Sequence, residues 1–414
     1  MRTSIKFILL AIIIINIVFY LYYKYSHPFW SRSPVAHYYN SFWLSEGHID
    51  LKRDPQNELV TELQQNEKWI QLDTSSIEEL NSFSHLLDNH YMYDTEFKYQ
   101  YTPEFIKWSL NTPYKHFKAL SQTDRKLWSA LLERDSKIIA SVTSRPLLLN
   151  SNGNKLHSFY VDYLCIAKEA RGQYLAPKMI LKVEPAIWAE NQTNTSNLSE
   201  HTDNINNNKN SPVSQYDFGK FNMYIFKKDG RQLPFKYVCR YKYYYINMRL
   251  LSLPRLSKQF KKIQNISISQ VYKYFVNITK GYKLFQEITI SEFKYLFIND
   301  IVDCYVLFNE NDKITGFSSF YNSQLVYYNN KTGSNLLTSC ETFYILGDNM
   351  TEIFDLTVNK VKEAGYQYIF TSNLFKNKAF IENYKFEYIC DCYYHLYNYY
   401  APPINPEECA LILP

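Results

Sequence analysis

The residues with the clearest chemical potential lie in one stretch, VDYLCIAKEARGQYLAP, which runs from Val161 to Pro177. Alternating apolar positions predict a strand, the charged residues after it a short loop, and the following segment a helix. Backbone N–H groups at a loop and a helix start suit a phosphate. An amphipathic strand that leads into a buried helix would have the same pattern.

The loop in this stretch resembles the phosphate-binding loop of acyl-CoA transferases in the acetyltransferase superfamily, whose pattern is Arg/Gln-x-x-Gly-x-Gly/Ala. Arg171, Tyr174 and Ala176 occupy the three marked places, and two of the three fit. The resemblance implies that a splayed or bulged strand end leaves backbone N–H groups free to polarise a thioester carbonyl, and that the loop and the helix start bind the coenzyme A pyrophosphate. The whole stretch is also similar to the signature of the eukaryotic N-myristoyltransferases, which reads roughly Asn-Phe-Leu-Cys-Val-His-Lys-x-Leu-Arg-Ser-Lys-Arg-Leu-Ala-Pro. This second resemblance is the more informative one, because other segments support it.

Those segments follow one another in the order of the N-myristoyltransferase family. YTPEFIKWSL, from Tyr101 to Leu110 and followed by Pro113, is similar to Tyr-Ser-x-Glu-Phe-Leu-x-Trp-Ala-Leu…Pro-Pro. Phe42-Trp43 is placed like the Phe-Trp pair that opens the family's catalytic domain. Four more matches complete the order: LP…CRY (Leu233 to Tyr241), GFSSFY (Gly316 to Tyr321), NKAFIENYKF (Asn377 to Phe386) and LYNY (Leu396 to Tyr399).

The resemblance implies an α/β (α+β) fold of two pseudo-twofold-related acetyltransferase-like halves, with a central mixed sheet flanked by helices. It implies transfer of a myristoyl group from myristoyl-CoA, the co-substrate, to the amino-terminal glycine of proteins, without a prosthetic group or metal. The backbone N–H groups of Tyr163 and Leu164 would form the oxyanion hole. The residues expected to bind the coenzyme and acyl chain are Ser41, Phe42, Trp43, Cys165, Ile166, Arg171, Gly172, Gln173, Tyr174, Leu175 and Ala176. Cys165 is not expected to be a nucleophile, because its motif holds no activating base.

The last residues, ALILP, are apolar where a frayed polar tail is usual, which indicates that they are buried. Members of the resembled family end on a similar segment, and their terminal α-carboxylate acts as the general base on the substrate's glycine. The resemblance therefore assigns this role to Pro414. The chemistry agrees, because a peptide ammonium with a pKa of about 8 must lose a proton to become a nucleophile. A tail that only plugs a pocket is the alternative.

Two positions around the expected site depart from the family pattern. Gln173 and Tyr174 replace a Lys-Arg pair, which removes two positive charges from the phosphate site and should weaken coenzyme binding unless other cations compensate. A glycine-rich turn near the carboxyl end is replaced by EYICDC, in which Asp391 is the possible equivalent of a substrate-binding aspartate. A turn that needs positive φ does not accept Tyr and Cys, so the local backbone must differ.

The expected peptide lid departs as well. The family's acidic run before the lid shrinks to Asp94 and Glu96, with Phe97 and Tyr99 as the lid aromatics that would contact the substrate. Basic residues downstream of the glycine should then be recognised less well. The family's Tyr-Trp-His-Arg-Ser segment is here Tyr241–Tyr245 and has lost its histidine.

The amino-terminal run FILLAIIIINIVFYLYY, residues 7–23, holds no charge and is long enough to cross most of a bilayer core. Tyrosines and Lys24 follow the pattern of an interfacial belt at one end. A cleaved signal peptide is the alternative, but the bulky YKYSHPFW that follows lacks the small residues of a cleavage site. We therefore expect a single-pass anchor and linker over residues 1–35, with the catalytic domain on the cytoplasmic side.

The rest of the chain predicts two mixed α/β halves, an acyl-CoA-binding half over residues 36–252 and a peptide-binding half over residues 253–414. PEFIKWSL (Pro103 to Leu110) and YKYFVNI have helical periodicity, whereas LHSFYVDYLCIA and CYVLFNE are rich in β-forming residues. Residues from about 190 to 215 are polar, Asn-rich and nearly free of apolar side chains, which predicts a disordered insert.

Composition excludes several other classes of protein. With 46% hydrophobic residues and a net charge of +5 over 414 residues, the chain can bury a large core but lacks the concentrated positive charge of a nucleic-acid-binding protein. Seven cysteines without a CxxC pair argue against a disulfide framework, and Cys390, Cys392 and His395 lack the usual spacing of a structural zinc site. We expect a monomer. An acyltransferase with another amine acceptor and an inactive acyl-CoA-binding or peptide-binding relative remain alternative hypotheses.

Overall fold

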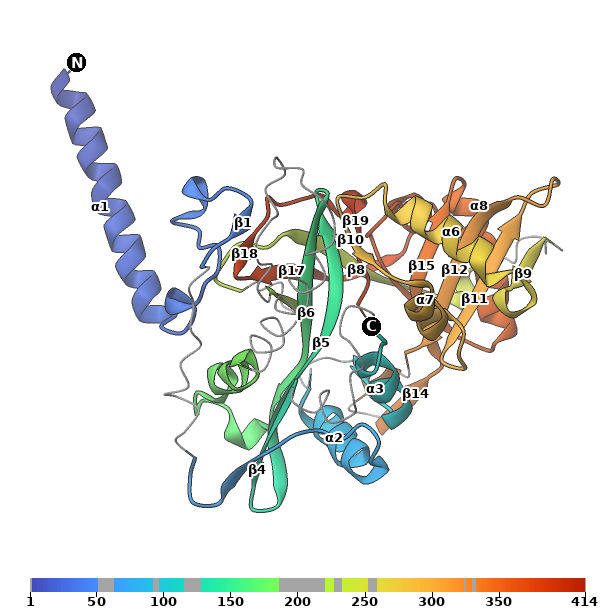
Figure 1. Ribbon diagram of the computed structural model, residues 1–414, viewed down its shortest axis with the longest axis horizontal. Helices are drawn as coiled ribbons and strands as arrows, with labels where there is room; N and C mark the ends of the chain where they lie inside the picture. Colours follow the sequence, from blue (N-terminus) through green and yellow to red (C-terminus); the bar gives the residue numbers. More distant parts are fainter. Residues whose placement is uncertain are drawn as a thin grey trace, which may run out of the picture.

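The computed structural model describes residues 2–50, 63–91, 97–114, 128–185, 220–226, 233–251, 259–323, 325–329 and 333–413, and the statements below concern these residues. A large mixed sheet passes through the described part of the molecule, with the strand order β19-β10-β5-β6-β7-β17-β8-β16-β15-β12-β11-β9. Strand β4 adds a branch on β5, and β2 pairs with β4. Figure 1 shows the long β5–β6 pair near the middle of the molecule, with β9, β11, β12 and β15 to one side of it. The predicted α/β class with a mixed sheet is confirmed.

The sheet is assembled from strands of very different lengths. Its members are β2 (Glu67–Ile70), β4 (Ser129–Arg134), β5 (Lys137–Ser151), β6 (Asn154–Ile166), β7 (Lys220–Phe226), β8 (Cys239–Asn247), β9 (Phe260–Lys262), β10 (Leu284–Glu287), β11 (Val302–Phe308), β12 (Ile314–Asn322), β15 (Ser339–Gly347), β16 (Tyr368–Ser372), β17 (Glu387–Tyr397) and β19 (Cys409–Ala410). Two small sheets hold β1 (Gly47–His48) with β18 (Tyr399–Tyr400), and β3 (Phe97–Tyr99) with β13 (Leu325–Asn329) and β14 (Gly333–Leu337).

Helices pack against both halves of the sheet, one group against the strands around β5 and another against β12 and β15. They are α1 (Arg2–Ser26), α2 (Ile77–His90), α3 (Pro103–Leu110), α6 (Ile268–Thr279), α7 (Ile290–Phe297), α8 (Met350–Glu363) and α9 (Lys378–Asn383), and residues 175–185 are also helical. Helices α2 and α3 contact β5, whereas α6 and α8 contact β12 and β15. The predicted helix over Pro103–Leu110 is confirmed, as are the predicted strands that became β6 and β11.

Local sequence signals explain where these helices begin. The Ser76 hydroxyl accepts the N–H of Glu79 at the start of α2, and Thr102 does the same for Phe105 at the start of α3, where Pro103 occupies the first turn. Such caps satisfy N–H groups that have no partner inside the helix, each worth about 1 kcal/mol. They fix the positions of two helices beside the site described below, since α2 ends there and α3 begins there.

One of the predicted limits between regions, that of the amino-terminal linker, lies within the described residues. Helix α1 projects away from the body (Figure 1), but the segment after it is packed against the sheet. Val35 is 1% exposed and forms a bridge with Tyr397, and the N–H of Asn398 donates to the carbonyl oxygen of Pro34. The expected linker up to residue 35 is therefore part of the folded body. The predicted insert at about 190–215 and the predicted boundary at residues 252 and 253 lie outside the described residues.

Candidate active site

A bulge near the end of β6 is the first feature of the site. Ser141 of β5 is opposite Cys165 and Thr143 is opposite Asp162, so Val142 alone faces the two residues Tyr163 and Leu164. Tyr163 has a φ of 49°, a left-handed value that a bulky residue adopts only where its surroundings impose it. The Ser141 hydroxyl donates to the Tyr163 carbonyl at 2.8 Å and the Thr143 hydroxyl to the Asp162 carbonyl at 3.2 Å. The bulge predicted from the sequence is thus present and braced from the neighbouring strand.

The loop after the bulge has the backbone of a turn that leads into a helix. Gly172 has a φ of 82° and Tyr174 a φ of 60°, and the helical residues 175–185 begin directly afterwards. The Arg171 guanidinium donates to the carbonyls of Ile166 and His90, at 3.2 and 2.7 Å. These bonds tie the loop to the end of β6 and to α2, and the start of the helix presents N–H groups beside a cationic side chain.

A cavity of about 780 Å³ lies against the bulge and the loop, and we call it the acyl cavity. Its walls are residues 26–30, 161–166, 170–172 and 174–177, with His90, Tyr91, Ile180 and Leu233. Its volume is within the usual range of small-molecule sites. Nine of the residues expected to serve the acyl donor line this cavity: Tyr163, Leu164, Cys165, Ile166, Arg171, Gly172, Tyr174, Leu175 and Ala176.

The other expected donor residues are placed elsewhere. Phe42 and Trp43 are each 87% exposed and do not line the acyl cavity, and the side chain of Ser41 lies outside the described residues. Gln173 does not line it either, because its side-chain oxygen accepts a hydrogen bond from Arg134 at 2.8 Å.

A different aromatic pair, Phe29 and Trp30, forms part of the wall instead. Trp30 also packs against Phe235, with ring centroids 4.9 Å apart. The sequence does carry a signal for this pair, because the Phe-Trp dipeptide occurs twice, at residues 29–30 and again 13 residues later at residues 42–43.

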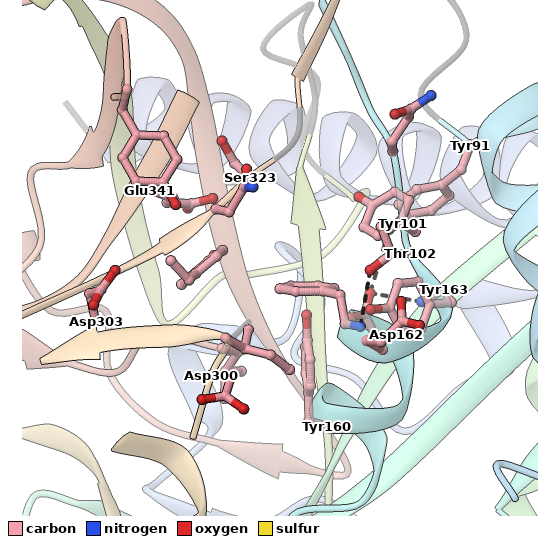
Figure 2. A pocket seen from close by; sticks show the side chains of 18 of the residues that line it. Tyr91, Tyr101, Thr102, Tyr160, Asp162, Tyr163, Asp300, Asp303, Ser323 and Glu341 are labelled. Carbon is pink, nitrogen blue, oxygen red and sulfur yellow. Dashed lines mark hydrogen bonds between the residues drawn. The ribbon is translucent and has the colours of Figure 1, made fainter. Parts of the chain in front are cut away.

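A second cavity, of about 410 Å³, opens on the other side of the bulge, and we call it the acceptor cavity. Its wall includes α3 residues, the ends of β11, β12 and β15, and the chain end at Leu413. Figure 2 shows Tyr91, Thr102 and Tyr163 on one side of it and Asp303 and Glu341 on the other. Three residues, Tyr91, Asp162 and Tyr163, line both cavities.

The acceptor cavity is strongly acidic. Its described lining contains no lysine, arginine or histidine, but it contains five carboxylates: Glu104, Asp162, Asp300, Asp303 and Glu341. Burial raises the pKa of Glu341 to about 7, although hydrogen bonds with Tyr321 and Tyr243 oppose the rise. Burial likewise raises the pKa of Asp162 to about 6, against hydrogen bonds from the Tyr163 N–H and the Tyr160 hydroxyl and the charge of Arg145. The cavity therefore has the charge to attract a cation and two carboxyl groups that titrate near neutrality.

One of the two N–H groups expected to form the oxyanion hole already has a hydrogen-bond partner. The N–H of Tyr163 donates to Oδ1 of Asp162 at 2.7 Å. An acyl oxygen that used this N–H would have to displace the carboxylate. The Tyr163 ring is buried, and its hydroxyl is 3.0 Å from the Ser109 hydroxyl of α3.

The described end of the chain is buried, as its sequence predicts. Leu411, Ile412 and Leu413 are 1%, 9% and 6% exposed, and the Tyr394 hydroxyl donates to the Leu411 carbonyl at 2.8 Å. Figure 1 shows this end near the centre of the molecule. Leu413 lines the acceptor cavity together with Tyr163 and Asp162. Pro414, the expected base, lies outside the described residues.

Of the three expected substrate-binding residues, only Asp391 has a described side chain. Asp391 lies on β17, where its carboxylate pairs with Arg240 at 2.6 Å, and it lines neither cavity. The strand β3 that carries Phe97 and Tyr99 pairs with β13, but their side chains lie outside the described residues. Asp94 and Glu96 are outside them as well.

The cysteines offer no nucleophile or metal site among the described residues. Burial raises the pKa of Cys165 to about 12, so its thiol stays protonated at neutral pH. His395 is fully buried and its Nδ1 lies 3.2 Å from the Lys236 carbonyl. In the described ranges, no three His, Cys, Asp or Glu side chains are arranged to hold a metal ion.

In this α/β fold, a strand bulge and the start of a helix both border a cavity large enough for a lipid chain. This combination is typical of an acyl-CoA-dependent acyltransferase. The family description "Myristoyl-CoA:protein N-myristoyltransferase, N-terminal domain" matches residues 49–194, and the description of its C-terminal domain matches residues 239–410. The chain belongs to the N-myristoyltransferase family and is an acyltransferase.

Individual relatives agree with this assignment. A glycylpeptide N-tetradecanoyltransferase of Dictyostelium discoideum is 25% identical over 408 residues, which are 94% of this chain and 92% of the relative. The Drosophila melanogaster enzyme of the same name is 24% identical over 84% of this chain and 72% of its own length. A crystal structure of Saccharomyces cerevisiae N-myristoyltransferase with bound myristoyl-CoA has the same fold, with a TM-score of 0.71 and 19% identity over 94% of this chain and 97% of that one.

Proposed function

We propose that this protein transfers a myristoyl group from myristoyl-CoA to the amino-terminal glycine amine of proteins. The observation that carries the proposal is the position of the β6 bulge between two cavities, one apolar beside a phosphate-type loop and one acidic. The acyl chain would occupy the acyl cavity, where burial of about 13 saturated carbons gives roughly 10 kcal/mol of gross transfer free energy. The glycine ammonium would enter the acidic acceptor cavity and meet the thioester at the bulge.

The proposed mechanism uses main-chain donors and a terminal base. The N–H of Leu164, joined by that of Tyr163 once Asp162 moves aside, would stabilise the thioester oxygen as it becomes negative. The α-carboxylate of Pro414 would accept a proton from the attacking nitrogen. The burial of Leu411–Leu413 and the place of Leu413 in the acceptor cavity support this role, because they bring the described end of the chain to the cavity that Asp162 and Tyr163 also line.

The test is a transfer assay on the full chain in detergent, with labelled myristoyl-CoA and peptides that begin with Gly, acetyl-Gly or Ala. We expect label on the free Gly amine alone. Removing Leu413 and Pro414 should slow transfer by at least about a hundredfold, the scale expected for a positioned base. A matched variant with one glycine added after Pro414 keeps the apolar packing but moves the carboxylate, and it should be slowed as well. Unchanged transfer by both variants would contradict the terminal base.

The acidity of the acceptor cavity favours cationic acceptors in general, so a different amine is the second candidate. A peptide with a blocked amino terminus and an internal lysine distinguishes the two. Label on the lysine, with none on the glycyl peptide, would replace the glycine assignment. Tight binding of myristoyl-CoA without transfer to either peptide would instead favour an inactive, acyl-CoA-binding relative.

We also propose that α1 anchors the enzyme in a membrane, with the catalytic domain on the cytoplasmic side. Residues Lys6–Ser26 are long and apolar enough to cross a bilayer, and their side chains are exposed, for example 66% at Ile15. The Tyr23 hydroxyl is hydrogen-bonded to Nδ1 of His37 at 3.0 Å, and residues 26–30 continue into the wall of the acyl cavity. Retention of this helix would bring the acyl cavity to the membrane surface, where long-chain acyl groups partition.

Membrane extraction tests the anchor. The full chain should stay with membranes after an alkaline wash, and deletion of residues 1–22 should release it. Release of the full chain by the same wash would contradict the anchor. Protection of the catalytic domain from protease in sealed vesicles would contradict the cytoplasmic orientation.

A further inference from the structure

Asp162 is the one carboxylate that lines both cavities in the described part of the chain. Its position is fixed by its backbone, because the Thr143 hydroxyl holds its carbonyl at 3.2 Å and the bulge begins at the next residue. Figure 2 shows its side chain beside Tyr163, on the wall of the acceptor cavity next to the bulge. A carboxylate at this point lies between the proposed thioester and the entering amine.

The groups that face Asp162 keep it charged without a direct ion pair. Tyr160 and Tyr163 come from β6, Tyr91 follows α2 with its hydroxyl 3.5 Å from Oδ1, and Arg145 comes from β5. Arg145 is 2% exposed, and its Nη2 has no hydrogen-bond partner among the described residues. The uncompensated guanidinium favours the ionised carboxylate, whereas burial favours the protonated form and leaves the pKa at about 6. Asp162 is therefore mostly ionised at neutral pH and still able to take a proton.

The reacting nitrogen gives up two protons in all: the glycine ammonium loses one to become a nucleophile, and the nitrogen loses a second when the amide forms. A single terminal carboxylate would have to pass the first proton on before it could take the second, and a second carboxylate beside the amine removes that constraint. The sequence pattern of the family has an asparagine at the position of Asp162, and an amide side chain cannot accept a proton at neutral pH.

We propose that Asp162 is a catalytic residue that binds the incoming ammonium and removes its first proton. This inference rests on the proposed function. The neutral amine then attacks the thioester carbon, a C–N bond forms, and the second proton passes to the Pro414 carboxylate. The C–S bond breaks, the coenzyme A thiolate leaves and takes up one of the two protons, and the other proton goes to solvent.

Proton uptake by Asp162 would also complete the oxyanion hole. The ionised carboxylate holds the Tyr163 N–H at 2.7 Å and would repel a developing negative charge beside it. Protonation removes that charge and weakens the hydrogen bond, so the N–H becomes available to the thioester oxygen. The arrival of an ammonium thus frees the Tyr163 N–H for the thioester oxygen. An acceptor without a proton to give would leave this N–H bonded to the Asp162 carboxylate.

The test compares Asp162→Asn with Asp303→Asn in the full chain. The asparagine keeps the shape and an oxygen for the Tyr163 N–H but cannot accept the proton, and Asp303 supplies a matched carboxylate of the same cavity, on β11 and paired with Lys262. We expect Asp162→Asn to lower kcat for a glycyl peptide by about tenfold at pH 7.5, because the terminal carboxylate must then take both protons, and to remove the acid limb of kcat/KM near pH 6. Asp303→Asn should keep that limb. An unchanged limb in Asp162→Asn would overturn the proposal.

A second acceptor separates a chemical role from a structural one. An aminooxyacetyl peptide carries an amine that is already neutral at pH 7.5, so the first proton transfer is not needed. The loss of activity caused by Asp162→Asn should be about tenfold smaller with this peptide than with the glycyl peptide. Equal losses with both peptides would assign Asp162 a structural role and overturn the proposal.

Thermal stability provides the control for folding. The pKa of Asp162 is raised in the folded state, so its ionised form opposes folding, and this cost grows as the pH rises through about 6. Asp162→Asn should therefore melt at the same or a higher temperature at pH 7.5. A lower melting temperature together with lost activity would contradict the proposal. Absence of transfer by the unmutated chain to any amine would refute the proposed function itself, whatever the variants do.

Discussion

The two cavities share the β6 bulge but differ in character. The acyl cavity is lined by the segment that best fits the family pattern, including Leu164, Cys165, Leu175 and Ala176, and its one carboxylate is Asp162. The acceptor cavity carries five carboxylates, and Glu341 among them was not anticipated from the sequence. An acyl chain is selected by volume and apolar contact, whereas a peptide is selected by charge and hydrogen bonds. The fold can thus keep its donor site while its acceptor site changes.

The acidic wall revises the expectation drawn from the lid. Loss of acidic residues near Asp94 and Glu96 suggested weaker recognition of basic peptides. Asp303 and Glu341 lie on the opposite side of the acceptor cavity from Tyr91 and Thr102 (Figure 2). Carboxylates on this wall could replace those of the lid, so basic acceptors remain the expected class.

Of the two cavities, the acyl cavity should show the larger effect. Trp30→Ala should raise the Kd for myristoyl-CoA by at least about tenfold, because an aromatic side chain contributes roughly 1.5–3 kcal/mol when buried against an apolar ligand. Trp43→Ala is the matched control, since Trp43 is 87% exposed and lies outside the cavity. Titration of a fluorescent acyl-CoA measures both. A larger effect at Trp43 than at Trp30 would show that the assignment of the cavity wall is incorrect.

A smaller effect is expected in the acceptor cavity. Glu341→Gln should raise the KM of a glycyl peptide with a downstream lysine about fivefold. This change corresponds to the loss of about 1 kcal/mol, which is typical of a partly screened charge pair. Because the pKa of Glu341 is about 7, the difference from the unmutated enzyme should be full at pH 8 and vanish as the pH falls to 6. The KM of a peptide with glutamate in place of the lysine should not rise. Equal changes for both peptides would show that charge is not what this wall selects.

The smallest effect concerns the charge behind the bulge. Arg145 lowers the pKa of Asp162, so Arg145→Met should move the acid limb of kcat/KM upward, by about half a pH unit for a charge that is near but not paired. Activity at pH 6.5 should fall while activity at pH 8 changes little. The pH profile of the variant measures this shift, and a downward shift would contradict the electrostatic assignment.

The donor side could be predicted from sequence because its signals are local. A strand, a turn with a glycine and a helix start lie within 17 consecutive residues, and their arrangement depends on the backbone, so a side-chain change such as Tyr174 leaves it intact. The apolar end of the chain was equally readable. Two identical Phe-Trp dipeptides, Phe29-Trp30 and Phe42-Trp43, cannot be told apart by their sequence, and the structure places the first of them in the wall of the acyl cavity.

The acceptor side could not be predicted, because distant strands build it. Glu341 and Asp303 enter the cavity through the register of β15 and β11, which sequence spacing does not reveal. Asp391 was assigned through a glycine-rich turn that this chain lacks, and it pairs with Arg240 across neighbouring strands instead. Asp162 could have been noticed in the sequence, because it is an acidic residue within an apolar strand. The family signature has an asparagine at this position, and the resemblance therefore drew no attention to the carboxylate.

A structure of the full chain with a non-hydrolysable myristoyl-CoA analogue would test the central claim, that the β6 bulge holds the thioester between the two cavities. We predict the acyl chain among residues 161–180, the carbon that replaces the thioester carbonyl within contact of the Leu164 N–H, and Asp162 on its acceptor side. An analogue bound with that carbon away from the bulge, or with its chain outside the acyl cavity, would contradict the account.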